Sequence, residues 1–198
     1  MRHFILASAS PQRKRLLSEL SRKFDVIPAD VDETLPAGIS PAEAAAHVAR
    51  RKAEKAARIA EGRGLEGVVV AADTIVLAGS ANPEVIGKPD DDDHAVAILG
   101  KLSGSRHTIV SGLCVFDMAS GKIELGWDET HVTMATMTDA QIREYVASGE
   151  SRGKAGAYGF QEEGDPYVKE VDGSFSNVLG LPLELLREFL RRIAGKTR

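Results

Sequence analysis

An aspartate lies inside the most apolar run of this 198-residue sequence. Residues 68 to 77 are valine, alanine, isoleucine and leucine apart from Asp73 and Thr74. Such a run is typical of a β-strand that is buried on both faces. A carboxylate there is unfavourable unless it is paired, binds a metal or lies at the exposed end of the strand. Asp73 is therefore a candidate for acid–base catalysis or metal binding, and the alternative is a structural aspartate that accepts backbone N–H groups.

Residues 8 to 13 combine hydroxyl and guanidinium donors at the expected start of a helix. Ser10 can cap that helix, and Pro11 suits its first position. The N–H groups of the first turn and the helix dipole favour an anion, and Ser8, Ser10 and Arg13 add donors that suit a phosphate. The alternative is an ordinary N-cap with a surface arginine.

Two lysines are further candidates for phosphate binding. Lys52 lies four residues after Val48 and four before Ala56, on the apolar face of an expected helix. A lysine on such a face either extends to the edge of the core or pairs with an anion. Lys88 lies between a glycine and a proline, which restrict its backbone, so it could neutralise a phosphate as a point charge. An ordinary turn lysine is the alternative.

Carboxylates and an amide could complete the site. Asp30, Asp32 and Glu33 form an acidic cluster whose oxygens suit Mg²⁺ or Mn²⁺, although a solvated acidic loop has the same composition. Residues 154–161 are rich in glycine and alanine, which lets a backbone approach a ligand closely. Gln161 offers both a donor and an acceptor to the edge of a base. A flexible surface loop is the alternative for this segment.

The elements that must position these residues alternate between strand and helix at first, and consecutive strands follow. Ser40 with Glu43, and Thr138 with Gln141, form capping boxes that start helices. The order predicts an α/β fold with a mixed central β-sheet flanked by helices. No repeat or linker divides the sequence, so we expect a single domain over residues 1–198. Strands are expected over residues 4–7, 24–28, 67–77, 84–87, 106–116, 122–134 and 168–175, with 106–116 and 122–134 antiparallel, and helices are expected to begin near residues 11, 41, 90–93, 139 and 182.

Composition excludes several classes of function. A net charge of −4 implies no dominant basic surface, so nucleic acid is not expected as a partner. The apolar stretch at the N-terminus is too short for a signal peptide or a membrane span, so we expect a cytoplasmic protein that does not bind membranes. The lone Cys114 fits a reducing compartment, and its apolar neighbours argue against a catalytic thiol. The sequence has no zinc-binding histidine spacing, no Walker A motif and no Rossmann glycine motif.

Eight short segments, in order and over nearly the whole chain, resemble the Maf family of nucleoside triphosphate pyrophosphatases. Each segment alone is weakly specific, and the ordered set is highly specific. The segments are Leu6–Arg13, Asp32–Glu33, Ala72–Thr74, Gly87–Pro89, Leu102–Gly104, Tyr145–Gly149, Lys154–Gln161 and Asn177–Pro182.

The resemblance implies an elongated, two-lobed α/β fold related to that of the inosine triphosphate pyrophosphatases. It also implies hydrolysis of a nucleoside triphosphate to the monophosphate and pyrophosphate, with a divalent cation, in a homodimeric protein that removes unwanted nucleotides. By position, Asp73 resembles the family's general base, and Glu33 and Asp73 resemble its metal-associated carboxylates. The positions that match its phosphate-binding groups are Ser8, Ser10, Arg13, Lys52 and Lys88. The positions that match those linked to base selection are Gln12, Thr74 and Gln161.

The substrate that the resemblance implies is dTTP, UTP or a modified pyrimidine nucleotide. Thr74 and the 154–161 segment match the pyrimidine branch of the family. Gln12 departs from it, because that branch usually has arginine there and the branch specific for 7-methyl-GTP has tryptophan. A pyrophosphatase for 7-methyl-GTP or another modified purine triphosphate is therefore one alternative, and a non-enzymatic regulator of septum formation is another.

Overall fold

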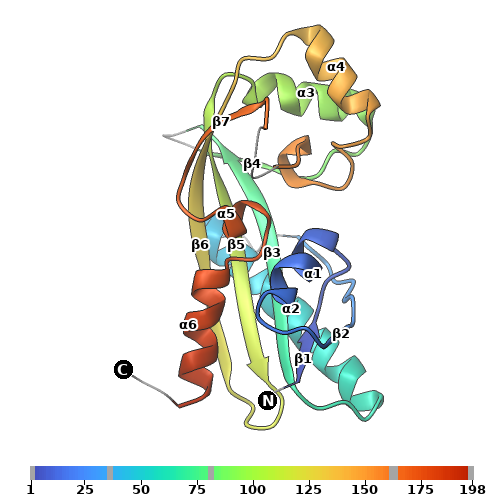
Figure 1. The fold of residues 1–198 in the computed structure, drawn as a ribbon, viewed down its shortest axis with the longest axis vertical. Coiled ribbons are helices and arrows are strands. Elements are labelled where there is room, and N and C mark those ends of the chain that lie inside the picture. Colours follow the sequence, from blue (N-terminus) through green and yellow to red (C-terminus); the bar gives the residue numbers. More distant parts are fainter. Residues whose placement is uncertain (1–2, 35–37, 80–82, 161–164, 196–198) are drawn as a thin grey trace. The chain divides into compact units, whose positions relative to one another are not determined.

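The computed structural model describes residues 3–34, 38–79, 83–160 and 165–195 (Figure 1). The chain forms two compact units. The first unit comprises Met1–Asp73, Ser111–Asp128 and Leu179–Arg198, and the second comprises Thr74–Val110 and Glu129–Val178.

The expected alternation of helices and strands is present, followed by consecutive strands. The strands are β1 (Phe4–Leu6), β2 (Phe24–Val26), β3 (Val68–Ala78), β4 (Glu84–Ile86), β5 (Arg106–Asp117), β6 (Ile123–Met134) and β7 (Val168–Asp172). The helices are α1 (Pro11–Ser18), α2 (Pro41–Gly62), α3 (Asp92–Leu102), α4 (Asp139–Ala147), the 3₁₀ turn η1 (Ala155–Ala157), α5 (Phe175–Val178) and α6 (Leu183–Ile193).

These strands form one seven-stranded sheet with the order β2-β1-β3-β5-β6-β7, and β4 also pairs with β3. β1 is parallel to both β2 and β3, whereas β4 and β7 are antiparallel to β3 and β6. β5 and β6 are joined by a tight turn in which Gly121 N donates to Asp117 O at 2.9 Å and Asp117 N donates to Lys122 O at 2.9 Å. The mixed α/β sheet and the antiparallel 106–116/122–134 pair are therefore confirmed.

The two faces of β3 explain its continuous apolar sequence. Alternate side chains of a strand point to opposite faces. Val68, Val70 and Ala72 pack in one cluster with residues of α1 and α6, whereas Val69 and Ala71 pack in another with the alanines of α2. Because both faces are covered by helices, neither set of side chains can be polar, and the first unit has a core on each side of its sheet (Figure 1).

The small residues of α2 allow it to lie close to β5 within the first unit. A Cβ atom placed on Gly112 would lie 2.3 Å from the carbonyl carbon of Ala45 and 2.4 Å from the nitrogen of Ala46. No side chain fits in that gap, so glycine is required on β5. Ser40 and Glu43 form the capping box predicted for this helix, with Ser40 N donating to Glu43 Oε2 at 3.0 Å.

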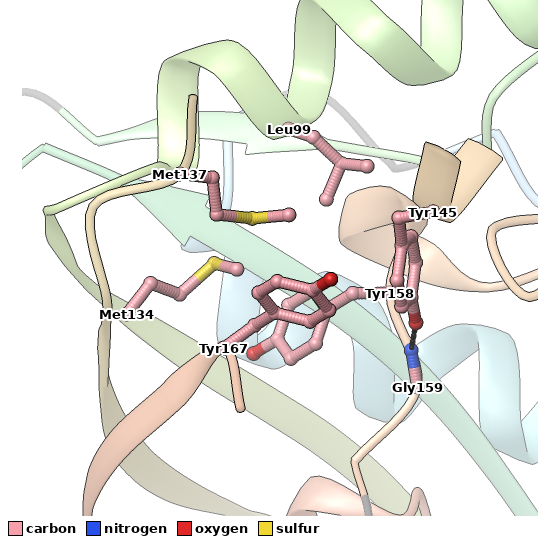
Figure 2. Close-up of a pocket in the computed structure, with 7 residues that line it drawn as sticks. All are labelled: Leu99, Met134, Met137, Tyr145, Tyr158, Gly159 and Tyr167. Carbon is pink, nitrogen blue, oxygen red and sulfur yellow. Dashed lines mark hydrogen bonds between the residues drawn. The ribbon is translucent and has the colours of Figure 1, made fainter. Parts of the chain in front are cut away.

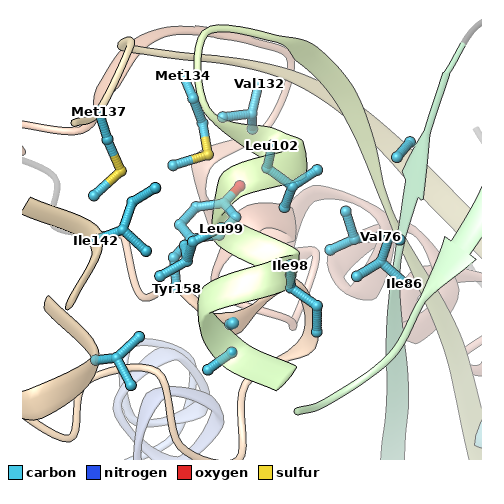
Figure 3. Close-up of a cluster of buried hydrophobic side chains, with 14 of the residues drawn as sticks. Val76, Ile86, Ile98, Leu99, Leu102, Val132, Met134, Met137, Ile142 and Tyr158 are labelled. Atoms are coloured by element: carbon cyan, nitrogen blue, oxygen red, sulfur yellow. The ribbon is translucent and has the colours of Figure 1, made fainter. Parts of the chain in front are cut away.

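The second unit has its own core around α3. Leucine, methionine and tyrosine side chains surround a small pocket there (Figure 2), and the buried cluster continues through β3, β4 and β6 (Figure 3). Asp91 caps α3 by accepting from His94 N at 2.7 Å, and Asp92 and Asp93 lie in its first turn, as the acidic run predicted. The pocket is lined by Leu99, Met134, Met137, Tyr145, Tyr158, Gly159 and Tyr167.

The predicted strand over 168–175 is too long. β7 ends at Asp172, Gly173 has a φ of +131°, and Phe175 begins the short helix α5. Ser174 caps that helix, because its hydroxyl accepts from Asn177 N at 3.3 Å and its carbonyl from Val178 N at 3.2 Å. The glycine and the serine therefore stop the strand three residues before the predicted end.

The helices of the described residues are too short or too polar to span a bilayer. Within residues 3–34, 38–79, 83–160 and 165–195, none combines the length and the apolar character needed to cross a membrane.

Candidate functional site

A buried lysine joins two of the predicted carboxylates in the first unit. Lys52 Nζ lies 2.6 Å from Asp73 Oδ1 and 2.7 Å from Glu33 Oε1. The side chains of Lys52 and Asp73 are 9% and 10% exposed, whereas that of Glu33 is 46% exposed. The arrangement is thus a buried ion pair whose second carboxylate faces solvent.

Local sequence places the two buried groups, Lys52 and Asp73. Lys52 is on the buried face of α2, as its spacing from Val48 and Ala56 predicted, and it pairs with anions rather than extending to solvent. The pairing of β3 with β1 ends at Val70, and Asp73 lies three residues further along β3. Beyond the carboxyl ends of parallel strands is where α/β proteins commonly bind ligands.

Arg13 and Ser8 extend this set of polar groups. Arg13 Nη1 lies 3.4 Å from Ser8 Oγ, and Arg13 Nε donates to the carbonyl of Gly180 at 2.8 Å. Burial lowers the pKa of the Arg13 guanidinium, while Asp73 and Glu33 act in the opposite direction through their charges. The charges of the two carboxylates that Lys52 contacts therefore act on Arg13, whose side chain is oriented by Gly180 and Ser8.

The start of α1 has the geometry that its sequence predicted. Ser10 is the N-cap, with its Oγ accepting from Arg13 N at 3.4 Å, and Pro11 follows in the first turn. Ser8 Oγ accepts from Ser10 N at 3.2 Å, which turns the chain from β1 into the helix. Gln12 Oε1 accepts from the Ser10 hydroxyl at 3.2 Å, so its amide is oriented by the cap.

Of the acidic loop, only Glu33 turns towards Lys52. Asp32 instead accepts from Thr34 N at 2.8 Å, and hydrogen bonds with Thr34 lower its pKa. Lys55 Nζ donates to the backbone carbonyl of Asp30. The predicted cluster of carboxylates is therefore reduced to the pair Glu33 and Asp73.

These two carboxylates fit a hard divalent cation. Among the residues that the structure describes, no group of three or more histidine, cysteine, aspartate or glutamate side chains could hold a metal by itself. Mg²⁺ commonly takes one or two protein carboxylates and completes its shell with water and substrate phosphates, so Glu33 and Asp73 are enough for such a site only when a phosphate is also present.

The remaining predicted residues fall in the second unit or outside the described ranges. Lys88 follows β4 and is exposed, and Thr74 is half-buried in β3, next to Asp73 in the chain. Gly156 N donates to Gly87 O at 3.1 Å, so the glycine-rich segment lies beside the turn that carries Lys88. Gln161 lies outside the described residues.

Cys114 is not a reactive group. It is buried in β5, and burial raises the pKa of its thiol to about 12. Burial and the raised pKa are the features that the sequence-based argument against a catalytic thiol assumed.

Sequence reasoning missed the roles of two residues that contact the candidate residues and the glycine-rich segment. The carbonyl of Gly180 orients Arg13 from a position 167 residues further along the chain. The buried His107 hydrogen-bonds the hydroxyl of Tyr158, within the glycine-rich segment. Gly180 belongs to the Asn177–Pro182 motif, so the motif signalled its importance although not its role, whereas His107 had no signal of its own.

Comparison with known proteins agrees with the geometry. The family model described as "Maf-like protein" matches residues 3–193. A protein from Pelotomaculum thermopropionicum named "dTTP/UTP pyrophosphatase" is 40% identical over 192 residues, which is 97% of each chain. One of the same name from Anaeromyxobacter dehalogenans is 45% identical over 190 residues, or 95% of this chain and 92% of that protein. The Staphylococcus aureus Ham1 protein has the same fold, with a TM-score of 0.52 and 16% identity over 97% of this chain and 100% of that one.

Proposed function

Because this chain belongs to the Maf family, we propose that it hydrolyses a nucleoside triphosphate, preferentially dTTP or UTP, to the monophosphate and pyrophosphate. The observation that carries the proposal is the buried Asp73–Lys52 ion pair, with Glu33 as the second partner of Lys52 and Arg13 electrostatically coupled to both carboxylates. A carboxylate held among fixed cations can activate water beside a polyphosphate. The names of the relatives support the pyrimidine substrate.

Cations placed in advance bind the triphosphate and stabilise the charge that builds up on it. Phosphoryl transfer depends mainly on positioning and electrostatic stabilisation. Arg13, held by Gly180 and Ser8, presents a planar guanidinium, and the start of α1 with Ser8 and Ser10 adds neutral donors. Lys88 adds a further point charge. Because Gly180 and Ser8 already orient Arg13, little side-chain entropy is lost when the phosphates bind.

Asp73 acts as the general base in this proposal. Lys52 donates to Oδ1 and so fixes the orientation of the carboxylate, and Oδ2 accepts a proton from the attacking water. The water oxygen forms a bond to the α-phosphorus, and the bond between that phosphorus and the bridging oxygen of the β-phosphate breaks. The products are the nucleoside monophosphate and pyrophosphate.

A divalent cation, Mg²⁺ or Mn²⁺, is part of the proposal, with Glu33 and Asp73 as its protein ligands. When bound, it would neutralise phosphate charge and make a bound water more acidic. Without the cation, Lys52 keeps the two carboxylates near each other, since its Nζ contacts both.

Base selection is assigned to Gln12, Thr74 and Gln161. The Gln12 amide is oriented by Ser10, so a defined donor and acceptor lie at the start of α1. Glutamine is smaller than tryptophan, the residue of the 7-methyl-GTP branch, and it is uncharged, unlike the arginine of the pyrimidine branch. We therefore expect pyrimidine triphosphates to be preferred, with a selectivity that Gln12 modifies.

The proposal is tested by incubating the protein with Mg²⁺ or Mn²⁺ and a panel of triphosphates: dTTP, UTP, CTP, 7-methyl-GTP, ITP and the common purines. Chromatography then separates monophosphate plus pyrophosphate from diphosphate plus phosphate. The first pair of products, fastest from dTTP or UTP, is the expected result. Diphosphate plus phosphate would contradict the reaction, and no turnover of any nucleotide would favour the regulator of septum formation.

We further propose that residues 1–198 act as one functional domain, that the protein is a homodimer, and that it works in the cytoplasm. The dimer follows from the family resemblance, and the cytoplasmic location fits the lone, buried Cys114. Sedimentation equilibrium would give the mass of the assembly: twice 21.2 kDa supports the dimer, and 21.2 kDa contradicts it.

A further inference from the structure

Backbone hydrogen bonds hold the segment Lys154–Phe160, here called the 154–160 loop, from two sides within the second unit. Gly156 N donates to Gly87 O at 3.1 Å, and Gly159 N donates to the hydroxyl of Tyr145 at 2.9 Å (Figure 2). The first bond joins the loop to the turn that carries Lys88. The second joins it to α4, so the loop backbone is fixed at two points three residues apart.

Side chains add two more attachments. His107 Nε2 and the Tyr158 hydroxyl share a hydrogen bond at 2.7 Å, with their rings edge to face at a centroid distance of 5.6 Å. Phe160 stacks on Phe175 at 5.6 Å with an interplanar angle of 22°. Four attachments within five residues leave the loop little freedom before it continues into Gln161.

Close packing also restricts the loop backbone. Gly156 has a φ of +74°, and a Cβ atom on it would lie 3.0 Å from Val76 and 3.3 Å from the Tyr158 ring. Tyr158 is thus both a wall against which the glycine packs and the partner of His107. Any shift of Tyr158 would be transmitted to Gly156 and, through its hydrogen bond, to Gly87.

His107 is a neutral and buried partner at physiological pH. It is 2% exposed, and burial lowers its pKa from 6.5 to about 4. Burial also raises the pKa of the Tyr158 hydroxyl, so the phenol keeps its proton. A hydrogen bond between two neutral buried groups is costly to break, because each group would lose its partner out of reach of water.

We propose that His107 is a positioning residue for nucleotide selection: its hydrogen bond with Tyr158 holds the 154–160 loop against the Gly87–Lys88 turn. The consequence is that the segment leading to the base-selecting Gln161 and the turn carrying a phosphate-binding lysine keep one relative geometry. Selectivity gained this way comes from pre-organisation rather than from a new contact with the nucleotide. The inference rests on the proposed function.

The test removes the hydrogen bond while keeping the ring. Tyr158→Phe deletes only the hydroxyl, and Tyr167→Phe is a matched control in the same aromatic cluster, because no hydrogen bond of the Tyr167 hydroxyl is found within the described residues (Figure 2). Amide exchange at Gly156 and Gly159 reports directly on the loop. We expect exchange there to be roughly 5- to 30-fold faster in Tyr158→Phe, with little change in the control.

Selectivity is measured as the ratio of kcat/KM for dTTP to that for CTP. Tyr158→Phe should lower this ratio several-fold, and Tyr167→Phe should leave it near the wild-type value. Replacing the histidine itself gives a second series: His107→Gln keeps a group that can hydrogen-bond the phenol and should retain more selectivity than His107→Phe.

The outcomes separate the two proposals. A wild-type protein that hydrolyses none of the panel would overturn the proposed function. An active wild type whose folded Tyr158→Phe variant keeps both its selectivity and its slow amides would overturn only the positioning role of His107. A loss of selectivity accompanied by fast exchange at Gly156 and Gly159 would support it.

Discussion

Replacing Lys52 by methionine removes the ammonium group that lies 2.6 Å from Asp73 and 2.7 Å from Glu33, while the length and apolar stem of the side chain are kept. The loss of this ion-pair partner should destabilise mainly the carboxylate of Asp73. Its side chain is only 10% exposed, so water cannot replace the lysine, whereas Glu33 is 46% exposed and remains solvated. Arg13 stays as the other cation coupled to Asp73.

The three residues should therefore differ in their effect on the free energy of unfolding. Removing one partner of a buried ion pair costs about 3–5 kcal/mol, which is the range expected for Lys52→Met. Asp73→Asn should cost less, about 1–3 kcal/mol, because Lys52 keeps Glu33 and the amide oxygen can still accept a hydrogen bond. Glu33→Gln removes a solvent-exposed partner and should cost at most about 1 kcal/mol.

Urea unfolding at pH 7 measures these values, and a double-mutant cycle isolates the pair. Lys52→Met combined with Asp73→Asn removes both charges of the buried pair, so the double variant should be about 1–3 kcal/mol more stable than the sum of the single losses predicts. Arg50→Met serves as the control. It removes an exposed ion pair with Glu54 from the same helix, where such pairs contribute about 0.3–0.5 kcal/mol.

The reasoning would be refuted if Lys52→Met lost no more stability than Arg50→Met. It would also be refuted by strictly additive single losses in the cycle. Either result would mean that the carboxylate of Asp73 is solvated without Lys52, and that α2 does not hold the base in place.

Three further predictions concern catalysis, pH and packing. Asp73→Asn should lower kcat by roughly 10²–10⁴-fold in the pyrophosphate-release assay, since the amide cannot take the proton of the attacking water. Burial lowers the pKa of His107 from 6.5 to about 4, so between these pH values the unfolded chain binds more protons than the folded protein. The free energy of unfolding should therefore contain a His107 contribution of about 3 kcal/mol that is complete above pH 6.5 and lost as the pH falls to 4. Urea unfolding of His107→Gln should show a flatter pH dependence than that of the wild type. Gly112→Ala should cost about 3 kcal/mol because its Cβ would meet the backbone of α2 at 2.3 Å, whereas Gly100→Ala on the exposed face of α3 should stabilise by about 0.5–1 kcal/mol in thermal unfolding.

Each of these has a result that contradicts it. Full activity of a folded Asp73→Asn variant would remove Asp73 from the role of base. An unchanged pH profile for His107→Gln would mean that His107 titrates normally in the folded protein. Equal melting temperatures for the two glycine variants would show that α2 can move away from β5.

The elements were largely predictable because their signals are local. The continuous apolar run of β3, the capping boxes at Ser40 and Thr138, and the spacing that puts Lys52 on the buried face of α2 depend only on neighbouring residues. The end of β7 was predicted wrongly, because Gly173 and Ser174 were not recognised as a turn and a cap.

The candidate site was predictable in its residue types and only partly in its contacts. The cost of a carboxylate in an apolar strand singled out Asp73, and the buried face of α2 singled out Lys52. Their pairing across 21 residues, and the selection of Glu33 but not Asp32 from the acidic loop, depend on how β2, β3 and α2 pack.

By itself, the sequence determined which residues could carry charge into the core and which motifs they form, because burial costs and local periods act on any chain with this order of residues. Only the tertiary structure decided which of those charges are neighbours. Arg13 is oriented by a carbonyl 167 residues away, and His107 holds Tyr158 from 51 residues away. Such contacts arise when separate strands and helices share one core, and the spacing of residues along the chain does not contain the distances between them.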